Sequence, residues 1–232
     1  MDSQVKYEDG PFDFSRAGIK SPYTYRENPY AEAYKKYANM RFAGAVYGDS
    51  FSSWAYSDSL SPYGSYGNWS AMRVSPIAAK YDVLDDVLEK SVQSAAATHN
   101  HIEGIKGGAG TAVMIWMAEN GYSKDQIFSY MLRLFKNSHT SLKDFSMEEL
   151  KKFPADDMSC RYCVPTAVIC FKNAGSCGET IANAISFEGD SDTIACIAGG
   201  IAAAYYGIPE KVRKTVNENK PKAIFDEMIA KF

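Results

Sequence analysis

From residue 76 onward, apolar residues recur along the chain at steps of three and four, the spacing typical of helices. One such stripe runs from Tyr81 through Leu84 and Leu88 to Val92. A second helix is predicted over 104–119. Alternation with a period of two, which would indicate strands, is essentially absent. We therefore predict an all-α, single-domain helical fold.

Local signals indicate where several of these helices begin and end. Ser123, followed three residues later by Gln126, forms a capping box that predicts a helix start. The apolar segment 194–206 stops just before Gly207, which is typical of a helix C-terminus. Further helical patterns cover 31–40, 147–152, 164–172, 179–187 and 222–231.

The first 40 residues differ from the rest of the chain. They are polar and aromatic, and several prolines interrupt helix formation. We predict an irregular arm with one short helix over 1–40 and a helical domain over 41–232. The stretch 42–66 is dense in Gly, Ser, Tyr and Pro, so it should be mostly loop with one helix near 51–56. Long loops inside a compact domain usually build a site.

Composition narrows the class of protein. The chain has 232 residues, 46% of them hydrophobic and 23% charged, with a formal net charge of −3. A charge so close to balance argues against broad nucleic-acid binding. The most apolar run, 194–208, is too short to cross a bilayer. The polar start of the chain is unlike a secretory leader, so we expect a cytosolic protein with no membrane partner.

The five cysteines are an odd number, as expected for reduced thiols rather than a disulfide framework. Cys160 and Cys163 have CxxC spacing. No second CxxC or nearby His pair completes a zinc site. Structural zinc or redox chemistry is therefore a minor alternative.

Three stretches carry residues suited to chemistry. In the first, 62–73, Gly64 and Gly67 flank a Ser-Tyr pair and allow the backbone to approach a ligand closely. Tyr66 could stack on a base or a ribose. A plain surface loop explains the same composition equally well.

The second stretch, 98–110, holds His99 and His101 followed by a run of glycines that includes Gly107 and Gly108. Glycines at a helix N-terminus expose backbone N–H groups that suit phosphate. The stretch is no P-loop, because the GxxxxGK[ST] pattern is not met. A purely structural role for the histidines is a fair rival.

The third stretch, 186–193, places Asp190, Asp192 and Thr193 just before an apolar helix. Such a cluster serves either as a helix cap or as a set of hard oxygen ligands for Mg²⁺, Mn²⁺ or Ca²⁺. Taken alone, the cap is the better interpretation.

In this order and at these separations, the three stretches resemble the ADP-ribosylglycohydrolase family, which includes dinitrogenase reductase-activating glycohydrolase and the ADP-ribosyl-acceptor hydrolases. The resemblance is carried by 63–76, 98–106 and 184–209, and it runs from about residue 47 to residue 209. It implies an all-α fold whose central cleft holds two Mg²⁺ or Mn²⁺ ions. It also implies removal of ADP-ribose from protein side chains, or hydrolysis of related ADP-ribosyl compounds.

The resemblance assigns roles by position. Asp190 and Asp192 would be catalytic carboxylates, and together with Thr193 they would be metal ligands. The ions would bind the ribose hydroxyls and polarise a water for attack at the anomeric carbon. The residues expected to bind the ADP-ribosyl group are Ser65, Tyr66, Gly67, Asn68, Trp69, His99, Gly107 and Gly108.

The chain also departs from the family pattern. The Gly-rich helix and Thr-Asp-Asp motif that supply the other half of the metal site have no counterpart before Tyr47. This implies one bound ion rather than two, with Mg²⁺ held weakly. Trp69 and Glu188 each stand where the family usually has glycine. The acidic residues that could replace the missing donors are Glu8, Asp9 and Asp13.

Two hypotheses follow. In the first hypothesis, the chain is a shortened, active hydrolase whose site is completed by the arm or by a second subunit. Alternatively, it is a catalytically inactive member that sequesters an ADP-ribose-type nucleotide or inhibits a protein partner. The expected partners are ADP-ribose, an ADP-ribosylated protein or a related nucleotide, with a protein partner or a homo-oligomer as further options.

Overall fold

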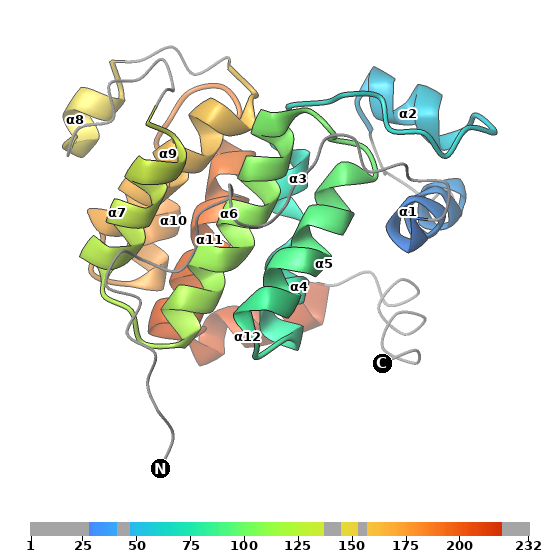
Figure 1. Cartoon of the computed structure of the whole chain (residues 1–232). Coiled ribbons are helices and arrows are strands. Elements are labelled where there is room, and N and C mark those ends of the chain that lie inside the picture. The colour runs from blue at the N-terminus through green and yellow to red at the C-terminus, as the bar shows by residue number, and fades with distance from the viewer. Residues whose placement is uncertain (1–27, 41–46, 137–144, 153–156, 220–232) are drawn as a thin grey trace.

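The computed structural model describes residues 28–40, 47–136, 145–152 and 157–219, and these residues form an all-α bundle (Figure 1). Within them the structure contains no named strand, and β-type pairing is limited to one antiparallel bridge between Gly67 and Ser159. The all-α prediction is therefore confirmed.

The helices follow the chain in a simple order. They are α1 (Pro29–Asn39), α2 (Asp49–Ala55), α3 (Trp69–Met72), α4 (Ser75–Lys80), α5 (Leu84–Ala96), α6 (Ile102–Glu119), α7 (Lys124–Leu134), α8 (Met147–Leu150), α9 (Cys160–Lys172), α10 (Cys177–Ile185), α11 (Ser191–Tyr206) and α12 (Glu210–Asn219).

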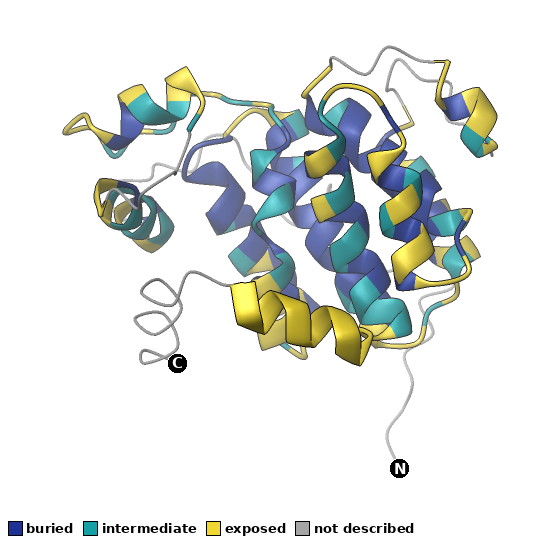
Figure 2. Cartoon of the chain, turned by 180° about the vertical axis from the view of Figure 1, so that it is seen from behind, coloured by how far each residue is buried: buried dark blue, intermediate teal, exposed yellow. Residues whose placement is uncertain are grey.

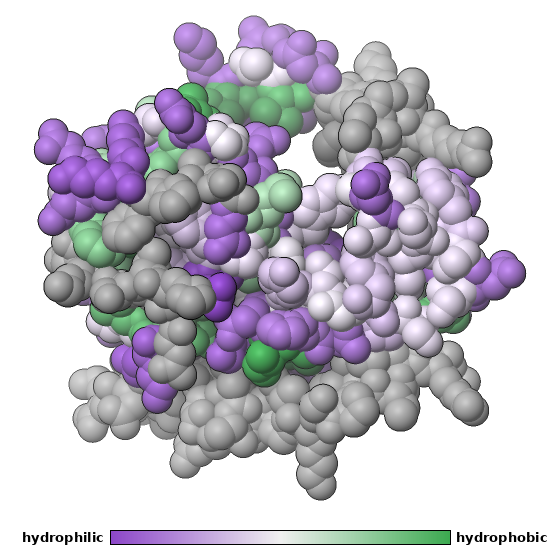
Figure 3. Space-filling view, turned by 90° about the horizontal axis from the view of Figure 1, so that it is seen from above, coloured by the Kyte–Doolittle hydropathy of each residue, from purple (hydrophilic) through white to green (hydrophobic). Residues whose placement is uncertain are grey.

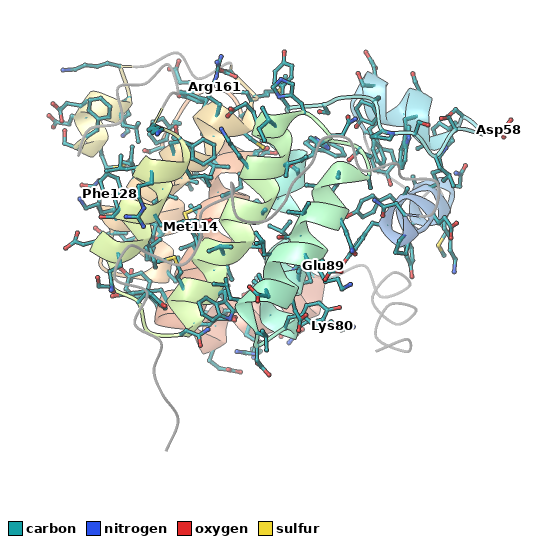
Figure 4. All side chains as sticks on the ribbon, viewed as in Figure 1. Asp58, Lys80, Glu89, Met114, Phe128 and Arg161 are labelled. Carbon is teal, nitrogen blue, oxygen red and sulfur yellow. The ribbon has the colours of Figure 1, made fainter. Side chains whose placement is uncertain are left out.

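Helix α6 is the centre of the bundle. It packs against α3, α4, α5, α7, α9 and α11, and most of its residues are buried. A helix that is apolar around its whole circumference is stable only when neighbours cover every side. Met114 of α6 is fully buried and lies in the middle of the bundle (Figure 4).

Helices α1 and α2 form a smaller unit at one side of the bundle (Figure 1). Their apolar residues, among them Ala31 and Trp54, make a separate buried cluster with Ala97 of the main bundle. Lys35 joins the two helices, because its Nζ donates to the Trp54 carbonyl at 2.6 Å and lies 4.8 Å from the centre of the Trp54 ring.

The C-terminal helix of the described part, α12, has no buried residue, and Figure 2 shows it exposed along its length. None of the helices in the described ranges is long and apolar enough to cross a membrane.

Several sequence predictions of helix ends need correction. The segment 164–172 is only the second part of α9, which begins at Cys160 and contains Pro165 in its interior. Pro29 does not interrupt a helix but opens α1, where its missing N–H is harmless. The capping box of Ser123 and Gln126 is confirmed. The pattern over 222–231 lies outside the described residues.

Candidate functional site

The first and second sequence stretches meet at one end of the bundle. The loop 62–68 is bonded to the end of α5, because the Ser65 N–H donates to the Thr98 carbonyl at 3.3 Å. Its other side is bonded to the start of α9, because the Cys160 N–H donates to the Tyr66 carbonyl at 3.0 Å and the Asn68 N–H to the Met158 carbonyl at 2.9 Å. The loop is therefore held by backbone bonds on two sides.

Figure 4 places Arg161, the second residue of α9, at this same upper end. Figure 3 looks onto the end from above. It shows weakly hydrophilic side chains gathered on the side where α1 and α2 lie, and strongly hydrophilic ones on the opposite side. The end is thus weakly hydrophilic on one side and strongly hydrophilic on the other.

Asn68 links the loop to the third stretch. Its Nδ2 donates to the Asp190 carboxylate and lies 3.3 Å from the Cys163 sulfur. The other Asp190 oxygen accepts a hydrogen bond from the Thr193 hydroxyl at 2.8 Å. Asn68 and Thr193 are buried, whereas Asp190 is partly exposed. One carboxylate is thus fixed by two buried donors and still reaches solvent.

This arrangement bears on the choice between a helix cap and a ligand-binding cluster. Asp190 occupies the N-cap position of α11, yet its side chain makes no capping hydrogen bond to the helix backbone. Its oxygens bond to the side chains of Asn68 and Thr193 instead. A simple cap would have used them on backbone N–H groups. The side-chain geometry therefore favours a site over a cap.

Asp192 and Glu188 lie beside this carboxylate in sequence, and both are exposed. The Asp192 carboxylate accepts a hydrogen bond from the Thr193 N–H at 2.9 Å. Gly189, with a φ of +78°, makes the turn that brings the chain into α11, a conformation that other residues adopt at a cost.

The donor chemistry here is that of a hard divalent cation, since carboxylate and hydroxyl oxygens suit Mg²⁺ or Mn²⁺. The set of donors is small: within the described ranges, and so also around Asp190 and Asp192, no group of three or more His, Cys, Asp or Glu side chains gathers in a way that suits a metal ion. The candidate donors Glu8, Asp9 and Asp13 lie outside the described residues.

His99 lies beneath the loop. It is 2% exposed, and its Nδ1 is 2.7 Å from the Thr98 hydroxyl. Burial, with a smaller contribution from the Arg73 cation, lowers the pKa of His99 to about 3. The ring is therefore neutral near pH 7.

Tyr66 and Trp69 flank the loop in different environments. Tyr66 is 58% exposed and makes an edge contact with His101, their ring centres 5.5 Å apart. Trp69 is partly buried and packs against Phe51 and Tyr47 of the α2 region, at 5.7 Å and 6.2 Å between ring centres. The indole thus joins α3 to α2, whereas the phenol of Tyr66 is largely exposed to solvent.

The prediction that Gly107 and Gly108 lie at a helix N-terminus needs correction. Helix α6 begins at Ile102, with His101 as its N-cap, so Gly107 and Gly108 lie beyond the first turn, where backbone N–H groups lack a partner within the helix. A Cβ on Gly107 would lie 2.1 Å from the Cys160 sulfur. Gly107 therefore serves close packing of α6 against α9.

The two CxxC thiols, Cys160 and Cys163, support the loop, a role that was not predicted from the sequence. Both are buried and free. Cys160 donates to the Gly67 carbonyl at 3.0 Å, and Cys163 lies against Asn68. Burial raises the pKa of each thiol to about 12. They are packing and hydrogen-bonding groups rather than thiolates. Their i, i+3 spacing, which puts both on one helix face, was the available signal.

Comparison with known proteins identifies relatives for most of the chain. A family model described as ADP-ribosylglycohydrolase matches residues 15–231. The match begins earlier than the resemblance found in the sequence, which started near residue 47.

Curated relatives include ADP-ribosylhydrolase ARH3 from Mus musculus, 31% identical over 188 residues, covering 63% of this chain and 51% of the relative. The Bos taurus protein of the same name is 30% identical over 188 residues, with 63% and 52% covered. The Gallus gallus protein is 29% identical over 230 residues, with 77% and 62% covered. The chain spans about half the length of the first two relatives.

A solved structure titled "ADP-ribosylglycohydrolase-related protein complex" superimposes with a TM-score of 0.64 at 19% sequence identity. It covers 82% of this chain and 69% of that one. At this level of identity the match establishes the fold alone.

Proposed function

Because this chain belongs to the ADP-ribosylglycohydrolase family, we propose that it binds an ADP-ribosyl group over the loop 65–68 and hydrolyses its glycosidic bond. The observation that carries the proposal is the hydrogen bond from Asn68 to Asp190. It places the loop suited to a nucleotide against the carboxylate suited to a cation, although the two are far apart in sequence.

We assign a different role in ligand binding to each residue at this end of the bundle. Asn68 and Thr193 fix the Asp190 carboxylate, so one of its lone pairs can face a ligand without rotation of the side chain. The exposed ring of Tyr66 offers a surface for a base or a ribose. Asp192, also exposed, supplies a second carboxylate two residues further along the chain.

We further propose that Asp190, Asp192 and Thr193 hold a Mg²⁺ or Mn²⁺ ion. Two carboxylates and a hydroxyl suit an ion that keeps several of its own waters, as Mg²⁺ commonly does. When bound, such an ion supplies Lewis-acid polarisation of a water and of the substrate oxygens.

Release of ADP-ribose from ADP-ribosylated arginine or serine peptides, followed in real time with Mg²⁺, tests the hydrolase. We expect Asp192→Asn to slow release at least about tenfold, since the loss of a ligand weakens metal binding and activity together. Glu188→Gln removes an exposed carboxylate from the same segment and is the matched control, expected to keep the wild-type rate. No release by the wild type at high protein concentration rejects hydrolysis.

Metal binding has its own readout. Mg²⁺ should raise the melting temperature of the wild type, because a ligand that binds only the folded state stabilises it. The double variant Asp190→Asn/Asp192→Asn should lose this increase, and Glu188→Gln should keep it. An equal increase in all three proteins would reject these ligands.

A second candidate function is capture of an ADP-ribose-type nucleotide without hydrolysis. It is favoured by the absence, within the described part of the chain, of a third His, Cys, Asp or Glu grouped with Asp190 and Asp192. Calorimetry with ADP-ribose, with and without Mg²⁺, tests it. Binding without turnover supports capture, and turnover with the wild-type protein rejects it.

A further inference from the structure

A series of side-chain contacts at this end of the bundle connects Arg73 to His99 through Thr98. We propose that Arg73 and Thr98 are positioning residues that hold His99 as the tautomer with its proton on Nε2 and direct that N–H to the underside of the loop 65–67. The identity of the ligand that would use this donor rests on the proposed function, whereas the tautomer does not.

Arg73 is held from three sides. Its Nη2 donates to the Ser94 carbonyl and to the Thr98 hydroxyl, both at 2.8 Å. Its guanidinium carbon lies 4.2 Å from the centre of the Tyr34 ring in α1, and the Tyr34 hydroxyl lies 2.6 Å from the Ser94 hydroxyl. A guanidinium fixed in this way has one orientation, so its contact with Thr98 is fixed too.

This contact determines the direction of the next hydrogen bond. Arginine carries only donors, so the Thr98 oxygen accepts from Arg73. Thr98 is fully buried, and within the described residues the partners of its hydroxyl are Arg73 and His99. Were His99 to donate from Nδ1, the hydroxyl proton would be left buried without an acceptor. Thr98 therefore donates to Nδ1.

Since Nδ1 is an acceptor and the ring is neutral, the single ring proton of His99 is on Nε2. A Cβ built on Gly67 would lie 3.4 Å from the Ser65 hydroxyl and 3.9 Å from His99 Nε2. Nε2 therefore faces the inner side of the loop between these residues. Within the described part of the chain it has no hydrogen-bond partner of its own.

A neutral donor at this place suits an oxygen of a phosphate or of a ribose hydroxyl. Arg73 makes the donor permanent in two ways. It orients Thr98, and its charge opposes a second proton on the ring. The arm helix α1 contributes through Tyr34, which covers the guanidinium.

The tautomer is measured directly by two-dimensional NMR of the ¹⁵N-labelled full chain, using long-range correlations within the imidazole rings. The variant His99→Gln identifies the His99 signals. In the wild type at neutral pH we expect Nδ1 of His99 to resonate as an unprotonated nitrogen and Nε2 as a protonated one. The opposite pattern, or an even mixture of the two tautomers, overturns the proposal.

Thr98→Val removes the hydroxyl with little change of shape. We expect the His99 signals to move toward a mixture of tautomers and the affinity for ADP-ribose to fall roughly three- to tenfold, the effect of one misplaced hydrogen bond. Thr98→Ser keeps the hydroxyl and should restore both.

The matched control is Thr111→Val. Thr111 is a second fully buried threonine, whose hydroxyl has no partner among the described residues. This variant should leave the His99 signals and the affinity unchanged. If Thr98→Val leaves the His99 signals and the affinity unchanged as well, the proposed positioning of His99 by Arg73 and Thr98 is rejected. If the wild type shows the expected tautomer but binds no ADP-ribose, the proposed positioning of His99 is supported and the proposed function is rejected.

Discussion

Asn68 and Asp190 are 122 residues apart in the chain and are joined by a hydrogen bond from the Asn68 amide to the Asp190 carboxylate. The same amide touches the Cys163 sulfur of α9. One side chain therefore connects the loop 62–68, helix α9 and the start of α11. The Asp190 carboxylate bonds to Asn68 and makes no capping hydrogen bond to the backbone of α11.

Replacing this amide should affect both the fold and the site. We expect Asn68→Ala to lower the free energy of unfolding by about 1.5–3 kcal/mol, since a hydrogen bond to a charged group is lost. Under the proposed function it should also reduce ADP-ribose release at least about tenfold. Urea unfolding and the release assay measure the two effects.

Asn39→Ala is the control, because the Asn39 amide donates, among the described residues, to the backbone carbonyls of Lys35 in α1 and Ala55 in α2. It should leave release unchanged. If Asn68→Ala keeps the wild-type rate, Asn68 does not support the reacting carboxylate.

Close packing of α6 against α9 is tested at Gly107. Gly107→Ala puts a methyl group 2.1 Å from the Cys160 sulfur, so the two helices must separate. We expect a loss of about 1–3 kcal/mol, which for a protein of this size lowers the melting temperature by roughly 2–4 °C per kcal/mol. Differential scanning calorimetry measures it.

Gly178→Ala in α10 is the matched control, since no atom lies within 4 Å of the added carbon. There alanine should be neutral or slightly stabilising, because it is the better helix former. Equal melting temperatures for the two variants would show that the structure around Cys160 accommodates the added methyl group without loss of stability.

Local patterns in the sequence were sufficient for the class of fold, because helical periodicity is a property of neighbouring residues. The apolar stripe through Leu84, Leu88 and Val92 became the buried face of α5. The helix predicted over 164–172 in fact begins at Cys160 and contains Pro165 in its interior. Packing on many sides stabilises a helix that its own residues favour less.

The site was predicted less completely for a physical reason. The residues that would touch a ligand carry recognisable chemistry. Asn68 does bond to Asp190, and Ser65 and His99 both lie beside Gly67. The residues that support these ligand-contacting side chains have no such recognisable chemistry. Arg73 reaches Thr98 across 25 positions, and Gly107 meets Cys160 across two helices. Such contacts depend on the path of the backbone, which periodicity does not determine.

The contact between α3 and α2 through Trp69 should contribute to stability. The Trp69 ring packs on Phe51 and Tyr47, so Trp69→Gly should lower the free energy of unfolding, by up to about 3 kcal/mol for a side chain that is only partly buried. Trp69→Phe should lose much less, since an aromatic ring remains. Thermal unfolding followed by calorimetry compares them, and equal melting temperatures would mean that the indole does not hold α2.

The buried His99 should make stability depend on pH. Its pKa is about 3 in the folded protein and near 6.5 in the unfolded chain, so the unfolded state binds a proton first as the pH falls. The stabilisation is complete above about pH 6.5 and is lost below it, at about 1.4 kcal/mol per pH unit. The difference in unfolding free energy between wild type and His99→Gln should therefore shrink by about this amount from pH 6 to pH 5, as measured by urea unfolding. His101→Gln, at an exposed position, should keep the wild-type slope. A difference that stays constant over this range would mean that the His99 ring takes up a proton in the folded protein.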